Sequence, residues 1–310
     1  MVIMASIITH SMRAFLVILI THLPVFVLSR TLEHTHTHTN TYPHSNPPLS
    51  FNSLRSLEGL SKGQTAKGLS NLKRYLNRFG YLNSDDGSDY FDEVLESAVK
   101  HYQQNYNLNV TRKHDYGTIK HMVVPRCGVR DSGLHGHESI NGSLYRFFHG
   151  NPKWPSDQTH LTYKFSSAVQ PVPLGVFRSV AAQAFAEWQR HSQFSFEEVQ
   201  PLSRSDLTLG FFVGDHGDGF PFDGPHNILG HAFSPTNGRL HLDGDETWTV
   251  GVPSYVDLFA VVLHEIGHLL GLAHSLDQNA VMYAQYSRAA IKRTLTQDDI
   301  DGIRALYSTP

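Results

Sequence analysis

The stretch HEIGHLLGLAHS, residues 264–275, combines a metal-binding pattern with a turn signal. His264 and His268 are four residues apart, so on a helix both imidazoles lie on one face and can reach one ion at about 2.0–2.1 Å. A helix can end at Gly271, and a chain that turns back there brings His274 to a third ligand position. Three neutral imidazoles leave a fourth position open for water, which is typical of a catalytic zinc site rather than a structural one.

Glu265 stands next to the first of these histidines, where its carboxylate can take a proton from a water at the ion and pass it to a leaving amine. The alternative is a buried helix that contains histidines by chance, because H-E-x-x-H alone recurs in unrelated sequences. The full H-E-x-x-H-x-x-G-x-x-H pattern in an apolar helix is much more specific, and Met282 follows it in AVMYAQY. We therefore predict a catalytic zinc centre in this part of the chain.

The segments around the motif alternate between expected strands and helices. A helix is expected over residues 176–191. Ser254 with Asp257, and Thr296 with Asp299, have the spacing of capping boxes at the starts of the motif helix and of the last helix. The expected strands are residues 160–165, 194–199, 206–213, 230–234 and 239–243.

Residues 51–124 have the apolar spacing of a small helical unit. Leu69, Leu72 and Leu76 recur at helical spacing before Gly80, and YFDEVLESAVKHYQQNYNL and DYGTIKHMVV predict two more helices. This part of the sequence holds no catalytic cluster. The pattern by itself predicts three helices around an ordinary apolar core.

Several motifs together resemble those of one family. They are the zinc motif with Ser275, Met282, PRCGV (125–129), HGDGFPFDGP (216–225), HAFSP (231–235), HLDGDETW (241–248) and LTQDDIDGIRALY (295–307). On these residues the chain, from about 60 to 307, resembles a matrix metalloproteinase, a matrixin of the metzincin clan, of the short plant type without a hemopexin domain. The resemblance implies an α+β fold. A helical prodomain similar to peptidoglycan-binding modules precedes a catalytic domain with a twisted, mostly parallel five-stranded sheet and three helices.

Cys127 is the only cysteine of the 310 residues, so the chain has no internal disulfide. The resemblance implies that its thiolate binds the catalytic zinc in a latent form, and that Arg126 and Asp131 form an ion pair that holds the segment in the cleft. A buried, unreactive cysteine is the alternative. Arg130 stands where the family usually has proline, which bears on the strength of latency.

Further metal ligands are implied by the same resemblance. Spacing alone does not establish them, since loop histidines and turn carboxylates are usually solvated. The expected ligands of a structural zinc are His216, Asp218, His231 and His241. The expected ligands of a calcium are Asp223, the carbonyl of Gly224, Asp243 and Glu246. Asp206 would serve a second calcium, although the accompanying glycine-rich loop is short here.

Composition and the terminal sequences bear on the partners of the protein and on whether it is secreted. A net charge of −3 gives no reason to expect nucleic acid or an anionic membrane as a partner. Arg13 precedes an apolar run at 14–28, which favours a signal peptide over a signal anchor. The end RALYSTP has no pattern for a C-terminal membrane anchor. Asn109 and Asn141 are potential glycosylation sites.

We expect a signal peptide (1–29), a low-complexity linker (30–50), a helical prodomain (51–127), an activation linker (128–150) and a catalytic domain (151–310). The expected function is that of a secreted, monomeric zinc endopeptidase made as a zymogen, with protein or peptide substrates in the extracellular space or cell wall. A wall-polysaccharide-binding protein and a metal-storage protein are the rivals. Glu265 decides against the first, because a binding module does not need a base beside metal ligands.

Two details of the expected protease stay open in the sequence. The family often has MYPxY beside its S1′ pocket, and this chain has Ala284 in place of the proline. The linker contains no paired dibasic site that would indicate the activating protease. The resemblance places processing between Asn141 and Asn151, with the new N-terminus pairing with Asp298 or, alternatively, Asp299.

Overall fold

The computed structural model describes residues 50–131 and 143–308. The expected signal peptide, residues 30–49 of the expected low-complexity linker and Asn141 lie outside these residues. No helix in the described ranges is long and apolar enough to cross a membrane.

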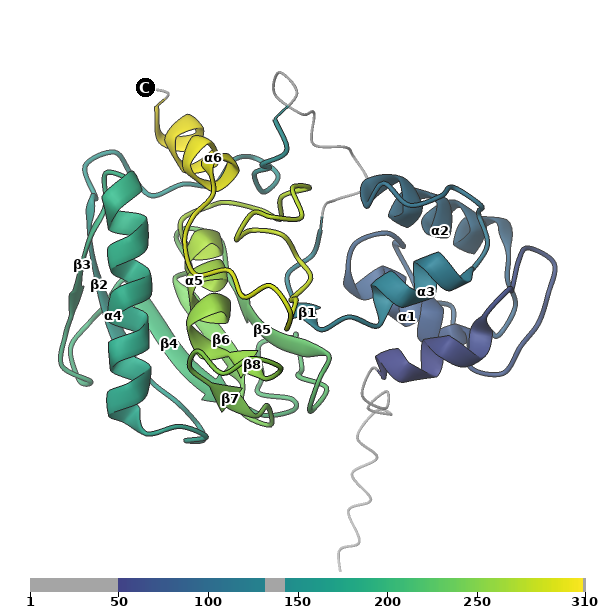
Figure 1. The fold of residues 1–310 in the computed structure, drawn as a ribbon, viewed down its shortest axis with the longest axis horizontal. Helices are drawn as coiled ribbons and strands as arrows, with labels where there is room; N and C mark the ends of the chain where they lie inside the picture. The colour runs from purple at the N-terminus through teal and green to yellow at the C-terminus, as the bar shows by residue number, and fades with distance from the viewer. Residues whose placement is uncertain (1–49, 132–142, 309–310) are drawn as a thin grey trace, which may run out of the picture. The chain divides into compact units, whose positions relative to one another are not determined.

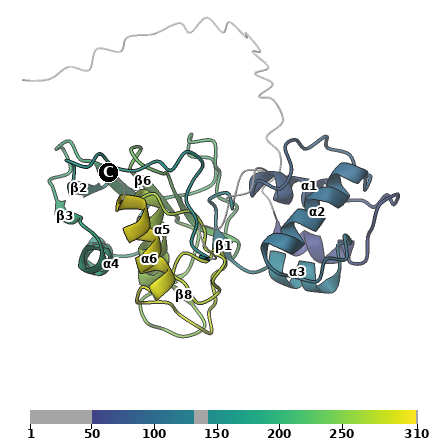
Figure 2. The same ribbon diagram turned by 90° about the horizontal axis from the view of Figure 1, so that it is seen from above.

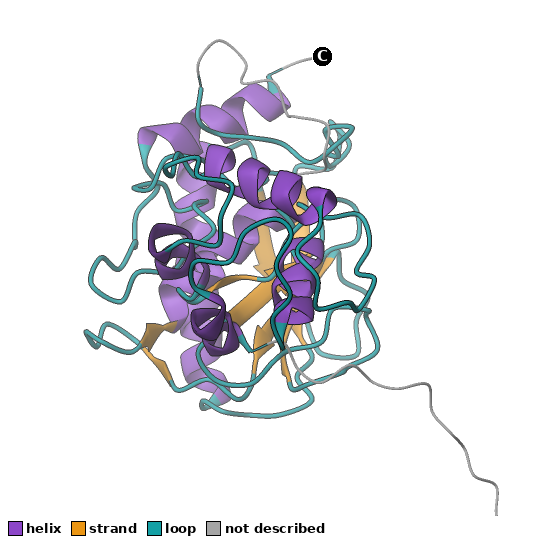
Figure 3. Ribbon diagram, turned by 90° about the vertical axis from the view of Figure 1, so that its right-hand side faces the viewer, coloured by secondary structure: helices purple, strands orange, loops and turns teal. Residues whose placement is uncertain are grey.

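The N-terminal part consists of helices and loops (Figure 3). Its core is rich in aromatic side chains. Asp92 and Asp115 cap the second and third α-helices by accepting hydrogen bonds from Leu95 N and Thr118 N. The ring of Phe51 packs edge-on against that of Tyr75, with centroids 5.0 Å apart. The elements are η1 (Phe51–Leu57), α1 (Leu69–Arg78), α2 (Glu93–Asn105) and α3 (Tyr116–Met122). The expected three-helix unit is therefore present, with a preceding 3₁₀ turn that the pattern did not indicate.

A mixed sheet forms the centre of the C-terminal part (Figure 1). Its order is β1-β5-β6-β4-β2-β3, and all neighbours are parallel except β5 and β6. The strands are β1 (Arg126–Cys127), β2 (His160–Phe165), β3 (Ser195–Glu198), β4 (Leu207–Phe212), β5 (Ile228–Ala232) and β6 (Arg239–Asp243). A separate pair joins β7 (Trp248–Thr249) to β8 (Val256–Asp257). The α+β class and the five-stranded mixed sheet are confirmed, and β1 adds a sixth strand from the segment around Cys127.

Three helices lie on one side of this sheet, as Figures 1 and 2 show. They are α4 (Leu174–His191), α5 (Leu258–Leu269) and α6 (Gln297–Tyr307). The indole of Trp188 on α4 donates a hydrogen bond to Leu263 O on α5, at 2.8 Å. Every residue of α5 is buried, so this helix runs through the core and holds its side chains rigidly.

The two expected helix starts differ in outcome. Thr296 and Asp299 form the reciprocal capping box of α6. The box at Ser254 and Asp257 is wrong: α5 begins at Leu258, and Asp257 itself is the cap, accepting from Ala260 N at 2.9 Å. Ser254 lies outside the helix with a φ of 70°, so its backbone is not in position to cap.

The segment before β2 is packed on the C-terminal part. Phe147 forms a β-bridge with Leu272, and the indole of Trp154 donates to Leu269 O at 2.8 Å. Both aromatic side chains are buried, so the chain from about residue 145 already belongs to this core.

Candidate active site and metal centres

The catalytic motif occupies the end of α5 and the turn that follows. Gly271 has a φ of 103°, and a Cβ there would stand 2.5 Å from Pro152 O. Only glycine fits this left-handed and crowded position, and the turn directs the chain back toward α5. His264 Nδ1 donates to Val281 O and His268 Nδ1 to Leu272 O, each at 2.7 Å. These bonds leave the Nε2 atom of each ring as the ligand atom.

Four ligand atoms meet at one point. Cys127 Sγ is 3.4 Å from His268 Nε2, which is 3.3 Å from His274 Nε2. With an atom of His264, these atoms lie within 4.8 Å of one another. His264 Nε2 is buried without a hydrogen-bond partner, and burial lowers the pKa of all three histidines, so they are neutral. This set fits a zinc ion with three imidazoles and one thiolate.

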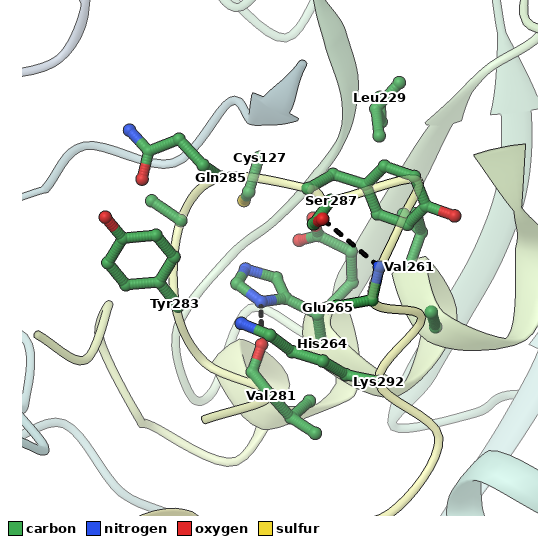
Figure 4. A pocket seen from close by; sticks show the side chains of 14 residues that line it. Cys127, Leu229, Val261, His264, Glu265, Val281, Tyr283, Gln285, Ser287 and Lys292 are labelled. Carbon is green, nitrogen blue, oxygen red and sulfur yellow. Dashed lines mark hydrogen bonds between the residues drawn. The ribbon is translucent and has the colours of Figure 1, made fainter. Parts of the chain in front are cut away.

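Glu265 lies directly beside this cluster (Figure 4). Its carboxylate oxygens are buried without a donor at bonding distance, and the Cys127 thiol is the neighbouring polar group. Burial raises the pKa of Glu265 to about 8. A carboxylate with a raised pKa is a stronger base, so it can take a proton from a water at the cluster and pass it to an amine.

Met282 packs against α5 at Gly267, between the first two histidines of the motif. A Cβ at Gly267 of α5 would lie 2.2 Å from Met282 Sδ and 2.9 Å from the Trp188 ring. The missing side chain at Gly267 therefore lets the methionine turn approach the back of the metal-binding helix. Asp299 fixes the same turn by accepting from the backbone N of Val281 at 2.9 Å and of Met282 at 3.0 Å.

The segment of Cys127 is hydrogen-bonded on both of its edges. Arg126 N and Gly128 N donate to Asn227 O and Gly230 O, while Cys127 N donates to Ala284 O, all at 2.7–3.0 Å. A Cβ at Gly128 would lie 2.8 Å from Ile228 Cγ2, so a larger residue would push the segment off β5. The thiol is thus held at the cluster by backbone hydrogen bonds to two segments, β5 with the residue before it and the chain at Ala284.

Arg126 and Asp131 form the expected ion pair in full burial. Although burial opposes ionisation, the guanidinium of Arg126 holds the pKa of Asp131 well below its usual range. Arg126 also stacks 3.7 Å above the centre of the Phe79 ring. Arg130, the unusual residue of this segment, is exposed and donates to Asn77 O at 3.0 Å.

A pocket opens beside Glu265, between α5 and the chain that follows Met282 (Figure 4). Lys292 Nζ donates to Ala280 O at 2.6 Å and lies 5.0 Å from the centre of the Tyr283 ring. Burial lowers the pKa of Lys292 to about 8. From α3, His121 Nε2 reaches Tyr283 Oη at 3.0 Å, and burial lowers the pKa of His121 to about 4.

A second cluster gathers four ligand atoms around Asp218. Its Oδ2 atom lies 2.9 Å from His216 Nε2, 2.7 Å from His231 Nε2 and 2.9 Å from His241 Nδ1. Burial lowers the pKa of His231 and of His241 to about 4, so both rings are neutral. Three imidazole nitrogens crowd one carboxylate oxygen, as expected for a closed tetrahedral zinc shell.

The carboxylates of the expected calcium ligands are near enough to interact, since Asp243 lies close to Asp223 and to Glu246. Asp223, Asp243 and Glu246 each have one buried carboxylate oxygen without a hydrogen-bond partner. Burial raises the pKa of Asp223 and of Asp243 to about 7, and the charge of Arg78 offsets this at Asp223 only in part. Oxygen atoms of this kind fit calcium. Asp206 differs: its oxygens accept from Gln158 Nε2 at 2.8 Å and from Thr162 N at 2.7 Å.

Two side chains of this region, and one contact of a third, gave no signal in the sequence. Lys292 and His121 stand in no motif, and their approach to Tyr283 depends on how distant segments pack. The third is Asp131 in a second capacity: its Oδ1 atom is 3.0 Å from His274 Nδ1. The resemblance indicated the ion pair of Asp131 but not this contact.

Comparison with known proteins agrees with the geometry. The family model described as "Matrixin" matches residues 153–308, and the "Putative peptidoglycan binding domain" model matches residues 65–122. The chain is 44% identical over 256 residues to metalloendoproteinase 1 of Glycine max, covering 79% of this chain and 83% of that protein. The chain belongs to the matrixin family.

Two further relatives of this matrixin have different lengths. Metalloendoproteinase 5-MMP of Arabidopsis thaliana is 39% identical over 311 residues, which cover 92% of this chain and 86% of that protein. Human neutrophil collagenase is 37% identical over 252 residues, which cover 78% of this chain and 50% of the collagenase. The matrixin is a zinc metalloendopeptidase, and its Cys127 lies at the histidine triad as a cysteine switch requires.

Proposed function

We propose that this matrixin is a secreted zymogen whose processed form cleaves proteins of the extracellular space or the cell wall. The observation that carries the proposal is the meeting of Cys127 Sγ with the ligand atoms of His264, His268 and His274 beside the buried Glu265. A thiol in this place excludes water from the centre, and it leaves only when the segment that carries it leaves.

The proposed organisation of the chain follows the boundaries expected from the sequence. These are a signal peptide at 1–29, a linker at 30–50, a prodomain at 51–127, an activation linker at 128–150 and a catalytic domain at 151–310. Support comes from the two family matches, which fall on either side of residue 127. Asn109 is exposed and is the glycosylation site that a secreted chain could use within the described residues.

In the proposed reaction, His264, His268 and His274 hold the ion. When bound, zinc polarises the scissile carbonyl and increases the acidity of water in the site. Glu265 accepts the proton that the attacking water gives up, and it then donates this proton to the leaving amine. Burial raises the pKa of Glu265, so its ionised form is a stronger base for the first step and keeps the accepted proton until the amine takes it. A wall-binding function would leave this arrangement without a role.

The other clusters are proposed to stabilise the catalytic domain. His216, Asp218, His231 and His241 would hold a structural zinc. Calcium would bind Asp223, Asp243, Glu246 and the carbonyl of Gly224. We do not extend the proposal to a second calcium at Asp206, because protein donors already occupy its carboxylate.

The new N-terminus is proposed to pair with Asp298 rather than with Asp299. The carboxylate of Asp299 already accepts from the backbone N of Val281, Met282 and Thr296. Asp298 accepts a hydrogen bond from Ser275 Oγ at 2.7 Å, and burial raises its pKa. An ammonium group beside Asp298 would therefore find a carboxylate that gains from a cation.

The zymogen proposal is tested by Cys127→Ser in the full chain. A hydroxyl is a poor zinc ligand at neutral pH, so the variant should hydrolyse peptides before any cleavage of its own chain, which mass spectrometry would verify. The unsubstituted zymogen, assayed in the same way, is the control. A serine variant that stays as latent as the control would show that the thiol is not the inhibitor.

A further inference from the structure

The three candidate zinc-binding histidines differ in the group that accepts the hydrogen bond from Nδ1, the ring nitrogen that faces away from the ligand position. His264 and His268 donate from Nδ1 to the backbone carbonyls of Val281 and Leu272, each at 2.7 Å. Both carbonyls belong, like the histidines, to the proposed catalytic domain. His274 has no such carbonyl: its Nδ1 atom is 3.0 Å from Oδ1 of Asp131, a residue near the start of the proposed activation linker.

The carboxylate of Asp131 is held in one orientation. Tyr81 Oη donates to its Oδ2 atom at 2.8 Å, and Arg126 donates to both of its oxygens. The backbone N of Asp131 donates to Phe79 O at 3.1 Å. Asp131 is 1% exposed and His274 is 3% exposed, so water does not compete for the contact between them.

A carboxylate at Nδ1 changes an imidazole ligand in two ways. It fixes the proton on Nδ1, so that the lone pair of Nε2 points to the shared ligand position, and it makes the ring a more basic ligand. A charged acceptor does this more strongly than a neutral carbonyl. The charge of Arg126 compensates that of Asp131, so the pair is stable in the buried site.

We propose that Asp131 is a positioning residue for His274, so that the zymogen retains its catalytic zinc more tightly than the thiol of Cys127 alone would allow. The inference rests on the zinc centre of the proposed function. Processing within the linker then removes two groups together, one from the ion and one from the outer side of His274. No other carboxylate of the described residues lies within hydrogen-bond distance of His274 Nδ1.

The test compares zinc release from intact zymogens that all carry Glu265→Gln, so that no variant can process itself. Asp131→Asn replaces the carboxylate by a neutral amide of the same size. Tyr81→Phe is the matched control, because it removes a hydrogen bond to the other oxygen, Oδ2, and leaves the contact with His274. Zinc transfer to an excess of a coloured chelator is followed over time, together with the reaction of the single thiol with a disulfide reagent.

Asp131→Asn is expected to release the zinc of the catalytic site about 10-fold faster, the lower end of what the loss of an outer partner of a ligand costs. The rate of zinc release from Tyr81→Phe should stay within about twofold of the parent. If the substitutions only loosened the segment, both variants would release zinc faster. At the start of the reaction Cys127 should be unreactive in all three proteins, which shows that the thiol still occupies its position. Exposure of the thiol then marks the release of the catalytic zinc rather than of the structural one.

Two results would overturn the inference. In one, Asp131→Asn releases zinc no faster than Tyr81→Phe. In the other, its thiol reacts from the start, which would mean that Asp131 only holds the segment through Arg126. A parent zymogen without catalytic zinc would instead contradict the proposed function, so the two failures are distinguishable.

A measurement on the unsubstituted protein covers the case in which Asp131→Asn does not fold. In the zinc-loaded zymogen, proton NMR should show a slowly exchanging Nδ1–H resonance for His274, shifted downfield by its carboxylate acceptor. Removal of the propeptide should abolish this resonance and leave those of His264 and His268. An unchanged His274 resonance after removal would count against the proposal.

Discussion

Calcium removal should destabilise the catalytic domain, and the structure indicates by how much. The pKa of Asp223 is raised from an ordinary 3.8 to about 7, mainly by burial. A shift of about three pH units corresponds to about 4 kcal/mol for keeping this carboxylate ionised at pH 7.5 without a cation. Asp243 shares the site, so the two shifts are coupled and we do not add them. For a domain of this size, about 4 kcal/mol lowers the melting temperature by about 10 °C.

The same shifts predict an unusual dependence on pH. Without calcium, the folded domain holds protons on these acids that the unfolded chain has already released. Its stability should therefore fall as the pH rises from about 4 to about 7, and bound calcium should abolish this fall. Away from this window the acids have the same charge in both states.

The assay is thermal unfolding of the Glu265→Gln zymogen at pH 5 and pH 7.5, with calcium or with a calcium chelator. Free zinc is buffered at one concentration throughout, and metal analysis verifies that zinc is retained. Asp206→Asn serves as the control, because its carboxylate is already paired with protein donors and should not change the response to calcium. Equal melting temperatures with and without calcium at pH 7.5, or a chelated zymogen that is no more stable at pH 5, would refute the reasoning.

The remaining predictions concern the reaction, latency and processing. Glu265→Gln should keep the zinc content of the parent and lose at least about 100-fold in turnover, because the ligands remain and the base does not; metal analysis and peptide hydrolysis measure both. The zymogen should expose its thiol faster as the pH falls from about 6.5 toward 4. Burial lowers the pKa of His121 to about 4 in the zymogen, so the ring takes up a proton in this range only when it leaves its contact with Tyr283, and protonation therefore favours release. His121→Gln should flatten that profile, measured as thiol reactivity against pH. Among catalytic domains that start at successive residues from Leu144 to His149, one should be fastest, and Asp298→Asn should remove its advantage.

Each of these predictions has an outcome that contradicts it. Near-normal turnover in folded Glu265→Gln would show that another group is the base. An unchanged acid profile in His121→Gln would mean that the contact with Tyr283 does not control release. Equal rates for all starting residues, or an advantage that survives Asp298→Asn, would exclude the proposed ammonium pair.

Local periodicity explains why so much of the candidate site could be predicted from the sequence. His264 and His268 share a face because any helix places residues i and i+4 together, and Gly271 ends that helix because its backbone conformation excludes side chains. The box at Thr296 and Asp299 is equally local. The start of α5 was misplaced because Ser254 has the right spacing, while its backbone conformation depends on the preceding turn.

Other features depended on contacts between segments that no local pattern encodes. A two-residue strand at Cys127 has no periodicity of its own and exists because β5 and the chain at Ala284 bond to its two edges. The resemblance to the family, and not spacing, led to its role.

The sequence by itself thus determined the three histidines of the catalytic motif, since ligand type, helical spacing and the turn at Gly271 are local properties. Only the tertiary structure decided which groups hydrogen-bond to the candidate ligands and how deeply these ligands are buried. The contact of Asp131 with His274 joins residues 143 positions apart, and the pKa shifts of Asp223 and Asp243 arise from burial that the packed chain creates. Burial and long-range pairing are properties of the folded whole, and they set the surroundings of each candidate ligand.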